Sequence, residues 1–121
     1  EEVYFLGARN DIESVLNKFD IFAFSTTANE GFGIAMAEAM GKGLPIIASD
    51  VGACRETLQN GKCGTLFKAH SALSIANNIE KIISDLKKTN NKRKYAYEYS
   101  IKNFTKKKMA INYLKELELE R

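Results

Sequence analysis

The sequence contains few side chains that bind metals or form covalent cross-links: two cysteines and one histidine among 121 residues. Cys54 and Cys63 are nine positions apart, no C-x-x-C motif occurs, and His70 is the one imidazole near them. A zinc site is therefore not expected. Two thiols in a chain of this size fit a reducing compartment, and a disulfide between them is the less favoured interpretation. We assign no role to these three residues.

The sequence also lacks any apolar run of the roughly 18 residues needed to span a bilayer. It begins with Glu1-Glu2, which does not resemble a signal peptide. With the sparse cysteines, these absences predict a cytoplasmic protein. No initiator methionine is present, which leads us to expect a piece of a longer chain.

The formal net charge of +3 is small, but lysines gather in the last third of the chain. They occur as Lys87-Lys88, Lys92-Arg93-Lys94 and Lys106-Lys107-Lys108. One interpretation is a patch for phosphate, anionic lipid or nucleic acid. Acidic residues are interspersed and no nucleic-acid motif is found, which favours solvated helix faces instead. Nucleic acid is therefore not an expected partner, whereas peripheral contact with the acidic inner face of a membrane stays open.

With 45% hydrophobic and 27% charged residues, the composition is that of a globular domain. Short apolar segments alternate with segments of helical periodicity over the first half of the sequence. Strands are expected at 3–7, 20–25, 45–48 and 65–67, and helices at 11–18, 33–41 and 53–59. This alternation predicts an α/β fold with a parallel sheet and right-handed crossovers.

The pattern changes at Ser71, which is expected to cap a long helix. Apolar residues then recur at spacings of three and four, as in an amphipathic helix: they are Ile75, Ala76, Ile79, Ile82, Ile83 and Leu86. Asn90-Asn91 is expected to break this helix, and two further helical pieces follow. Tyr95 and Tyr99 are expected to pack in the core or at a domain seam rather than to stack on a nucleotide base.

The segment from Glu30 to Met40 is the most informative, and it follows a predicted buried strand. Glu30 precedes Gly31-Phe32-Gly33, and Glu38 lies eight positions after Glu30 among helix-forming residues. The glycines let the main chain approach a ligand closely. The first N–H groups of the helix have no partner within it and carry partial positive charge, so they suit a phosphate. With two carboxylates to bind hydroxyls, the segment favours a nucleotide-linked sugar over a bare phosphate.

Taken singly, the two glutamates are better explained as a first-turn acid and a solvated helix residue, but the whole segment resembles a known family. It is similar to the E-x7-E signature of the retaining glycosyltransferases with the GT-B fold, the group 1 family. The resemblance continues at 43–50, 51–56 and 60–67, and upstream at 3–7. Two departures concern loop shape: Ser25-Thr26 stands where the family often has Pro-Ser, and the loop 51–55 has one glycine where many members have two.

The resemblance implies roles for individual residues. Glu30 would be catalytic, contacting hydroxyls of the transferred sugar and supporting charge at the reacting centre. The donor-binding residues would be Gly31, Phe32, Gly33, Ile34 and Glu38. Backbone N–H groups of the turn would bind the diphosphate or sugar, and Glu38 would bind the ribose. No metal and no cofactor is implied beyond the nucleotide-diphosphate sugar, whose hexosyl group would pass to an acceptor hydroxyl with retention of configuration.

The resemblance also implies an incomplete domain. Residues 1–68 would be a Rossmann-like core holding the last four strands of a GT-B C-terminal, nucleotide-sugar-binding domain, and residues 69–121 would be helices packing on it. Two βα units and the acceptor-binding N-terminal domain would be missing, so the chain alone would bind donor weakly and be inactive. The strand at 3–7 would lack its neighbours, which predicts self-association through the incomplete sheet.

Three other functions stay open at this point, one of them a structural or interaction domain whose melting temperature no nucleotide sugar would shift. A nucleotide-sugar epimerase of similar fold would also bind the diphosphate but would need no acceptor. A non-catalytic module would bind a nucleotide in the same pocket and perform no chemistry.

Overall fold

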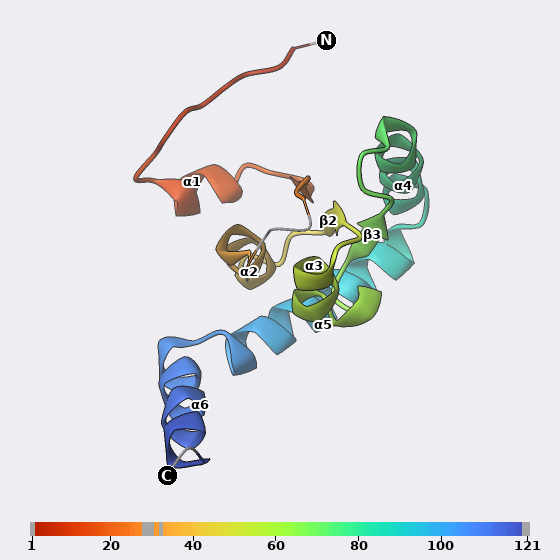
Figure 1. Ribbon diagram of the computed structural model, residues 1–121. Helices are drawn as coiled ribbons and strands as arrows, with labels where there is room; N and C mark the ends of the chain where they lie inside the picture. Colours follow the sequence, from red (N-terminus) through yellow and green to blue (C-terminus); the bar gives the residue numbers. More distant parts are fainter. Residues whose placement is uncertain (1, 28–30, 32, 120–121) are drawn as a thin grey trace.

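The computed structural model describes residues 2–27, 31 and 33–119. The elements of this part are α1 (Ile12–Leu16), β1 (Phe22–Phe24), α2 (Ile34–Gly41), β2 (Ile46–Ser49), α3 (Gly52–Thr57), a 3-10 turn (Gln59–Gly61), β3 (Thr65–Phe67), α4 (Ala72–Ser84), α5 (Leu86–Asn103) and α6 (Lys106–Leu119). Helices follow each strand (Figure 1), so the predicted alternation is confirmed.

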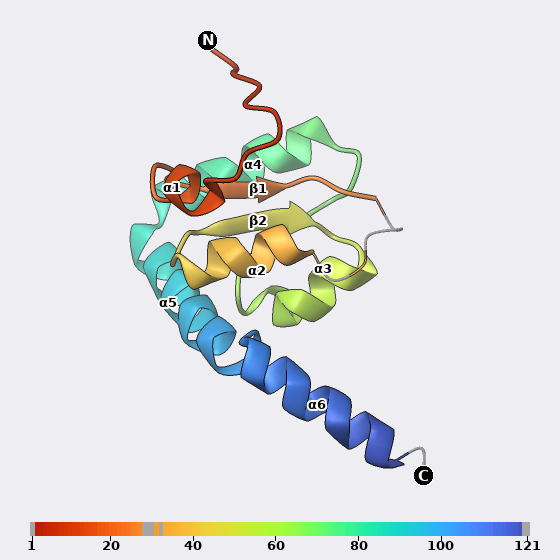
Figure 2. The ribbon, with the colours of Figure 1, turned by 90° about the vertical axis from the view of Figure 1, so that its left-hand side faces the viewer.

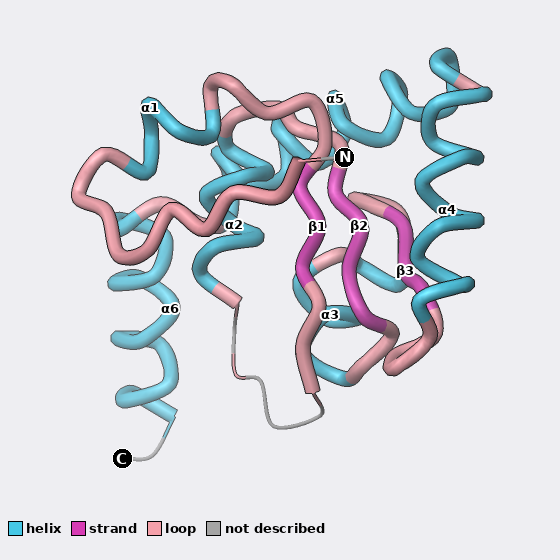
Figure 3. Tube along the Cα trace, turned by 90° about the horizontal axis from the view of Figure 1, so that it is seen from above, coloured by secondary structure: helices cyan, strands magenta, loops and turns pink. Residues whose placement is uncertain are grey.

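The three strands form one parallel sheet in the order β1-β2-β3. Phe22 pairs with Ile46 in the first ladder, and Ile47 pairs with Thr65 in the second. Parallel strands require a crossover between them, and here α2 and α3 provide it. Figure 3 shows the three strands side by side, and the predicted α/β class is confirmed.

Helices cover both faces of the sheet, which explains why β2 is buried along its whole length. On one face Ile46 and Ala48 pack against Met36 and Met40 of α2, together with residues of α3 and α5. On the other face Ile47 and Phe67 pack against α4 through Ile75, Ile79 and Ile82. The sheet is thus the middle of three layers (Figure 1).

The expected strand at 3–7 is wrong, so the described sheet has three strands rather than four. Val3 is 79% exposed and Phe5 96% exposed, and this segment leads away from the sheet (Figure 2). The apolar, β-prone residues favour a strand locally, but a strand needs a neighbour to hydrogen-bond. No described strand flanks the outer edge of β1, where Ala23 is exposed.

The expected helix break at Asn90-Asn91 is also wrong, because α5 runs through both asparagines. The break lies at Asp85, whose side chain accepts a hydrogen bond from the backbone N–H of Lys88 and so caps α5. Asn90 is tolerated inside the helix, where its side-chain oxygen accepts a hydrogen bond from Arg93. The cap predicted at Ser71 is confirmed, since its hydroxyl accepts from the N–H of Ser74 at 3.1 Å.

The last helices extend the fold away from the sheet. Tyr99 packs against the core cluster and meets the ring of Phe104 edge to face, with centroids 5.4 Å apart, as expected of a core tyrosine. Beyond it α6 contacts α5 and projects from the body (Figures 1 and 2). None of the helices in the described ranges combines the length and the apolar composition needed to cross a membrane.

Both cysteines lie buried in the core and form no disulfide with each other, and this gives a first testable prediction. Cys54 is 0% and Cys63 1% exposed, and burial raises the pKa of Cys63 to about 11. We therefore expect both thiols to react with a disulfide reagent at pH 8 at least about 100-fold more slowly in the folded chain than in denaturant. The thiol of Cys63 loses its proton more easily in the unfolded chain than in the folded one. The free energy of unfolding should therefore fall as the pH rises from 9 towards 11.

Equal labelling rates in native and denatured samples would contradict this assignment of both thiols to the core.

Candidate functional site

The candidate site is built around the turn between β1 and α2. Gly33 is the N-cap of α2 and has left-handed backbone angles, φ 74° and ψ 62°. Glycine adopts such angles without strain, whereas a residue with a Cβ does not. A Cβ on Gly33 would also lie 2.6 Å from Cε of the buried Met36 and 3.7 Å from the ring of Phe24. The glycine identified from the sequence is therefore required by the backbone conformation, and an added Cβ would also displace the end of the Met36 side chain.

The first amides of α2 point out of this turn. The carbonyl of Gly33 accepts hydrogen bonds from the N–H groups of Met36 at 3.0 Å and Ala37 at 3.3 Å. The N–H groups of Ile34 and Ala35 come before them and have no partner inside the helix. The helix dipole adds partial positive charge at this end. The arrangement suits an anionic group placed beyond the carboxyl end of β1.

Glu38 lies one helical turn after Ile34, and both side chains are exposed. Residues four apart share a side of a helix, so Glu38 is on the side that also carries Ile34. Its carboxylate is thus available to a ligand that lies along α2. Gly31 is described and exposed, whereas Glu30 and Phe32 lie outside the described residues. The predicted pairing of Glu30 with Glu38 around the amides stays a prediction.

Two side-chain contacts lie near the end of β2, at the edge of the sheet where the glycine turn also lies. The hydroxyl of the buried Ser49, at the end of β2, accepts a hydrogen bond from the N–H of Thr26 at 2.9 Å. This bond fixes the chain after β1 against β2. Arg55 of α3 forms an ion pair at 2.6 Å with Asp50, which directly follows β2, and this contact raises the pKa of the guanidinium.

The sequence did not identify these two contacts. Ser49 carried a weak signal, a small polar residue ending an apolar strand, but its partner lies 23 positions away. The Arg55–Asp50 pair means that this cation, although close to the strand ends, already has a counter-charge. Within the described ranges no three His, Cys, Asp or Glu side chains gather as a metal site would require.

Three comparisons with known proteins agree with this geometry. The family pattern described as glycosyl transferases group 1 matches residues 1–99. A curated relative from Campylobacter jejuni, N,N'-diacetylbacillosaminyl-diphospho-undecaprenol alpha-1,3-N-acetylgalactosaminyltransferase, is 32% identical over 113 residues, which cover 93% of this chain and 30% of the relative. The chain spans between 21% and 30% of the length of the first three curated relatives that it matches.

Solved structures show the same fold. Anabaena HepE in complex with UDP and glucose superposes with a TM-score of 0.83 and 31% identity, covering 97% of this chain and 31% of that one. The C-terminal domain of LpcC, a glycosyl transferase group 1 family protein from Francisella tularensis, gives a TM-score of 0.72 and 27% identity, covering 86% of this chain and 53% of that one. The parallel sheet and its flanking helices are thus those of GT-B glycosyltransferases. This chain belongs to the glycosyl transferases group 1 family.

Proposed function

We propose that this chain forms the donor-binding part of a glycosyltransferase, which moves a hexosyl group from a nucleotide-diphosphate sugar to an acceptor hydroxyl with retention of configuration. The observation that carries the proposal is the left-handed Gly33 at the start of α2, after which the first N–H groups of the helix have no partner within it. The likeness to HepE, a structure that contains UDP and glucose, supports a nucleotide-sugar ligand.

Each part of the site has a role in this proposal. The backbone amides at the start of α2, from Gly33 to Ala35, bind the diphosphate, and their dipoles stabilise the charge that develops on it as the glycosidic bond breaks. Glu38 accepts hydrogen bonds from the ribose hydroxyls. Glu30 and Phe32 complete the motif, Glu30 with its carboxylate towards the transferred sugar. The mechanism calls on no metal ion.

The proposal concerns a larger protein, because the chain covers less than a third of the curated relatives discussed above. In it an acceptor-binding domain closes over the donor, and additional cations bind the diphosphate. The 121-residue chain supplies the amides and both acids, so we expect it to bind donor weakly and to transfer sugar at a negligible rate. Efficient transfer by this chain alone would contradict its assignment as one part of the enzyme.

Thermal unfolding with nucleotide sugars tests the binding role. We expect uridine, guanosine or adenosine diphosphate sugars to raise the melting temperature of the chain. The sugars that carry one of these bases should raise it more than the others. At a ligand concentration ten times the Kd, stabilisation is about 1.4 kcal/mol, or roughly 5–6 °C for a domain of this size. Glu38→Ala should weaken binding by about tenfold, because it removes two charge-assisted hydrogen bonds.

The matched control is Glu80→Ala on α4, which changes an exposed glutamate on the opposite face of the sheet. This variant should show the same ligand-induced rise in melting temperature as the parent chain. If no nucleotide sugar stabilises the chain, or if both variants weaken binding equally, the donor site is not at the start of α2.

A further inference from the structure

A cavity lies at the end of the sheet opposite the glycine turn. It measures about 90 Å³ and lies where β2 and β3 begin, between these strands and the helices α4 and α5. Pro45, just before β2, and Gly64, just before β3, form part of its wall. Gly33 and the carboxyl ends of the strands are at the opposite edge. The cavity is therefore separate from the proposed donor site, and the inference below does not depend on that proposal.

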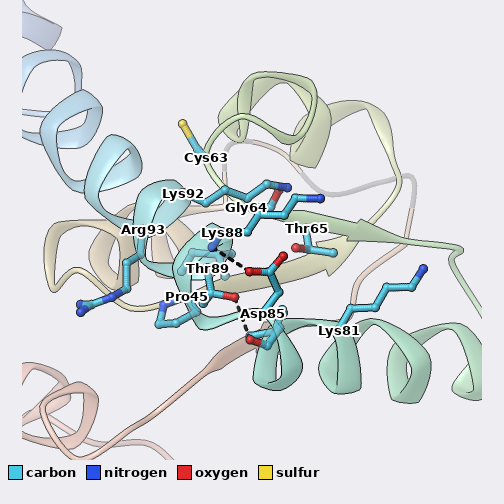
Figure 4. A pocket seen from close by; sticks show the side chains of 12 residues that line it. Pro45, Cys63, Gly64, Thr65, Lys81, Asp85, Lys88, Thr89, Lys92 and Arg93 are labelled. Carbon is cyan, nitrogen blue, oxygen red and sulfur yellow. Dashed lines mark hydrogen bonds between the residues drawn. The ribbon is translucent and has the colours of Figure 1, made fainter.

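Cationic side chains dominate this cavity. Lys81 reaches it from α4, and Lys88 and Lys92 reach it from successive turns of α5 (Figure 4). The ion pairs found in the described part of the chain involve Arg9, Lys42 and Arg55, so none of these three lysines has a counter-charge there.

The other charged groups of the lining do not cancel this excess. Asp85 is the carboxylate among the lining residues, and it already accepts the backbone N–H of Lys88 as the cap of α5. Arg93 also lines the cavity, but its guanidinium donates to Asn90 and to the carbonyl of Gly43, and Figure 4 shows it pointing away from the lysines. The lining therefore carries one carboxylate against three lysines, of which Lys88 and Lys92 lie close together and Lys81 extends away from them (Figure 4).

Two further features, the fixed position of Lys92 and the hydroxyl of Thr65, make the cavity a suitable anion site. Lys92 is held in place because its Nζ donates to the carbonyl of Gly64 at 3.2 Å. Partial burial and the neighbouring charge of Lys88 both lower the pKa of Lys92, as expected where cations crowd together. Thr65 adds a hydroxyl beside the lysines (Figure 4), and no hydrogen bond of that hydroxyl is found within residues 33–119.

We propose that this cavity binds a phosphate group, held by Lys88 and Lys92 together with the hydroxyl of Thr65, with Lys81 adding positive charge at its rim. Two ammonium donors and a hydroxyl match the several acceptor oxygens and the double negative charge of a phosphate. At about 90 Å³ the cavity is smaller than the roughly 300–1,000 Å³ of sites for drug-sized ligands, so it takes a single phosphate rather than a nucleotide. Both inorganic phosphate and the monoester headgroup of a lipid carry this chemistry.

Titration of the ¹⁵N-labelled chain with inorganic phosphate, at constant ionic strength, tests the proposal. We expect saturable amide shifts centred on Gly64, Thr65 and the first turn of α5. Lys88→Gln combined with Lys92→Gln should weaken binding at least about tenfold, because two charged donors are lost. Lys88→Gln alone should weaken phosphate binding about threefold. Because the side chain of Lys88 is exposed, this variant should fold like the parent chain, and the lost affinity can be assigned to the site.

The matched control is Lys87→Gln combined with Lys94→Gln, which removes the same charge from exposed lysines of α5 that do not line the cavity. It should change the affinity by less than twofold. An equal loss in both double variants, or shifts spread over all lysines, would overturn the proposal, because phosphate would then be attracted by net charge alone.

A parallel experiment with vesicles of phosphatidylcholine and phosphatidic acid identifies the source of the phosphate. Vesicle binding that is lost in the Lys88 and Lys92 double variant assigns the site to a lipid headgroup. Saturable binding of inorganic phosphate without vesicle binding assigns it to a free phosphate or a small phosphomonoester. Binding of neither ligand overturns the proposal.

Discussion

Glu30→Gln in the full-length enzyme is expected to lower kcat by about 100-fold or more and to leave the affinity for the nucleoside diphosphate within about twofold. Glutamine has the same shape and keeps hydrogen bonds to sugar hydroxyls, but it carries no negative charge. A carboxylate that stabilises positive charge at the reacting carbon acts mainly in the transition state, where one well-placed group contributes about 10²–10³ in rate. Steady-state kinetics with separate measurement of nucleotide affinity makes the distinction.

The control for this variant is Glu80→Gln, the same substitution at an exposed position of α4, and its kcat should equal that of the parent enzyme. The experiment also separates the competing functions. A nucleotide-sugar epimerase would form product without an acceptor, and a non-catalytic module would show no turnover before or after the change. A kcat unaffected by Glu30→Gln in an active transferase would remove Glu30 from the chemistry.

The parts of the fold that the sequence predicted well carry strong local signals. Gly33 and the helix after it were recognised because glycine spacing and helix-forming residues occur in one short segment, and the structure gives α2 at Ile34–Gly41. The strand at Thr65–Phe67 and the cap at Ser71 were also identified, the first from its flanking turn and the second from a hydroxyl before an amphipathic pattern. In these segments the residues nearby in sequence decide the structure.

The two wrong secondary-structure predictions concern segments whose conformation depends on residues far away in the sequence. Residues 3–7 have strand-forming side chains, yet the described part of the chain offers them no neighbouring strand. Asn90-Asn91 looks like a helix break, yet Ala96 and Ser100 further along α5 are buried against the rest of the fold and keep the helix continuous. Packing thus outweighs the local preference of two asparagines.

The candidate sites show the same difference between features set by neighbouring residues and features set by residues far apart in the sequence. The glycine turn is a short motif and was found, whereas the Thr26–Ser49 and Arg55–Asp50 contacts depend on how strand ends meet. The phosphate cavity joins Lys81 and Lys92 with residues before β2 and β3. From sequence Lys88 and Lys92 were interpreted as part of solvated helix faces and Lys81 was not singled out, because periodicity shows which residues share a face but not which faces meet across a cavity.

Gly64→Ala is expected to lower the free energy of unfolding by about 3 kcal/mol. Gly64 is buried just before β3, and a Cβ there would lie 2.9 Å from the backbone oxygen of Ile46 and 3.1 Å from its Cβ. It would also lie 3.3 Å from Cδ1 of the fully buried Leu58. Relief requires β3 to move away from β2, which weakens the ladder that begins with Ile47 and Thr65.

Urea denaturation of the 121-residue chain measures this loss. With an unchanged slope, the midpoint should fall by roughly 1–2 M. The control is Gly52→Ala at the first position of α3, where no atom lies within 4 Å of the added Cβ. Since alanine favours a helix more than glycine does, this variant should be at least as stable as the parent. Equal midpoints for Gly64→Ala and the parent would mean that β2 and β3 separate at little cost, contrary to the close contacts of Gly64 with Ile46 and Leu58.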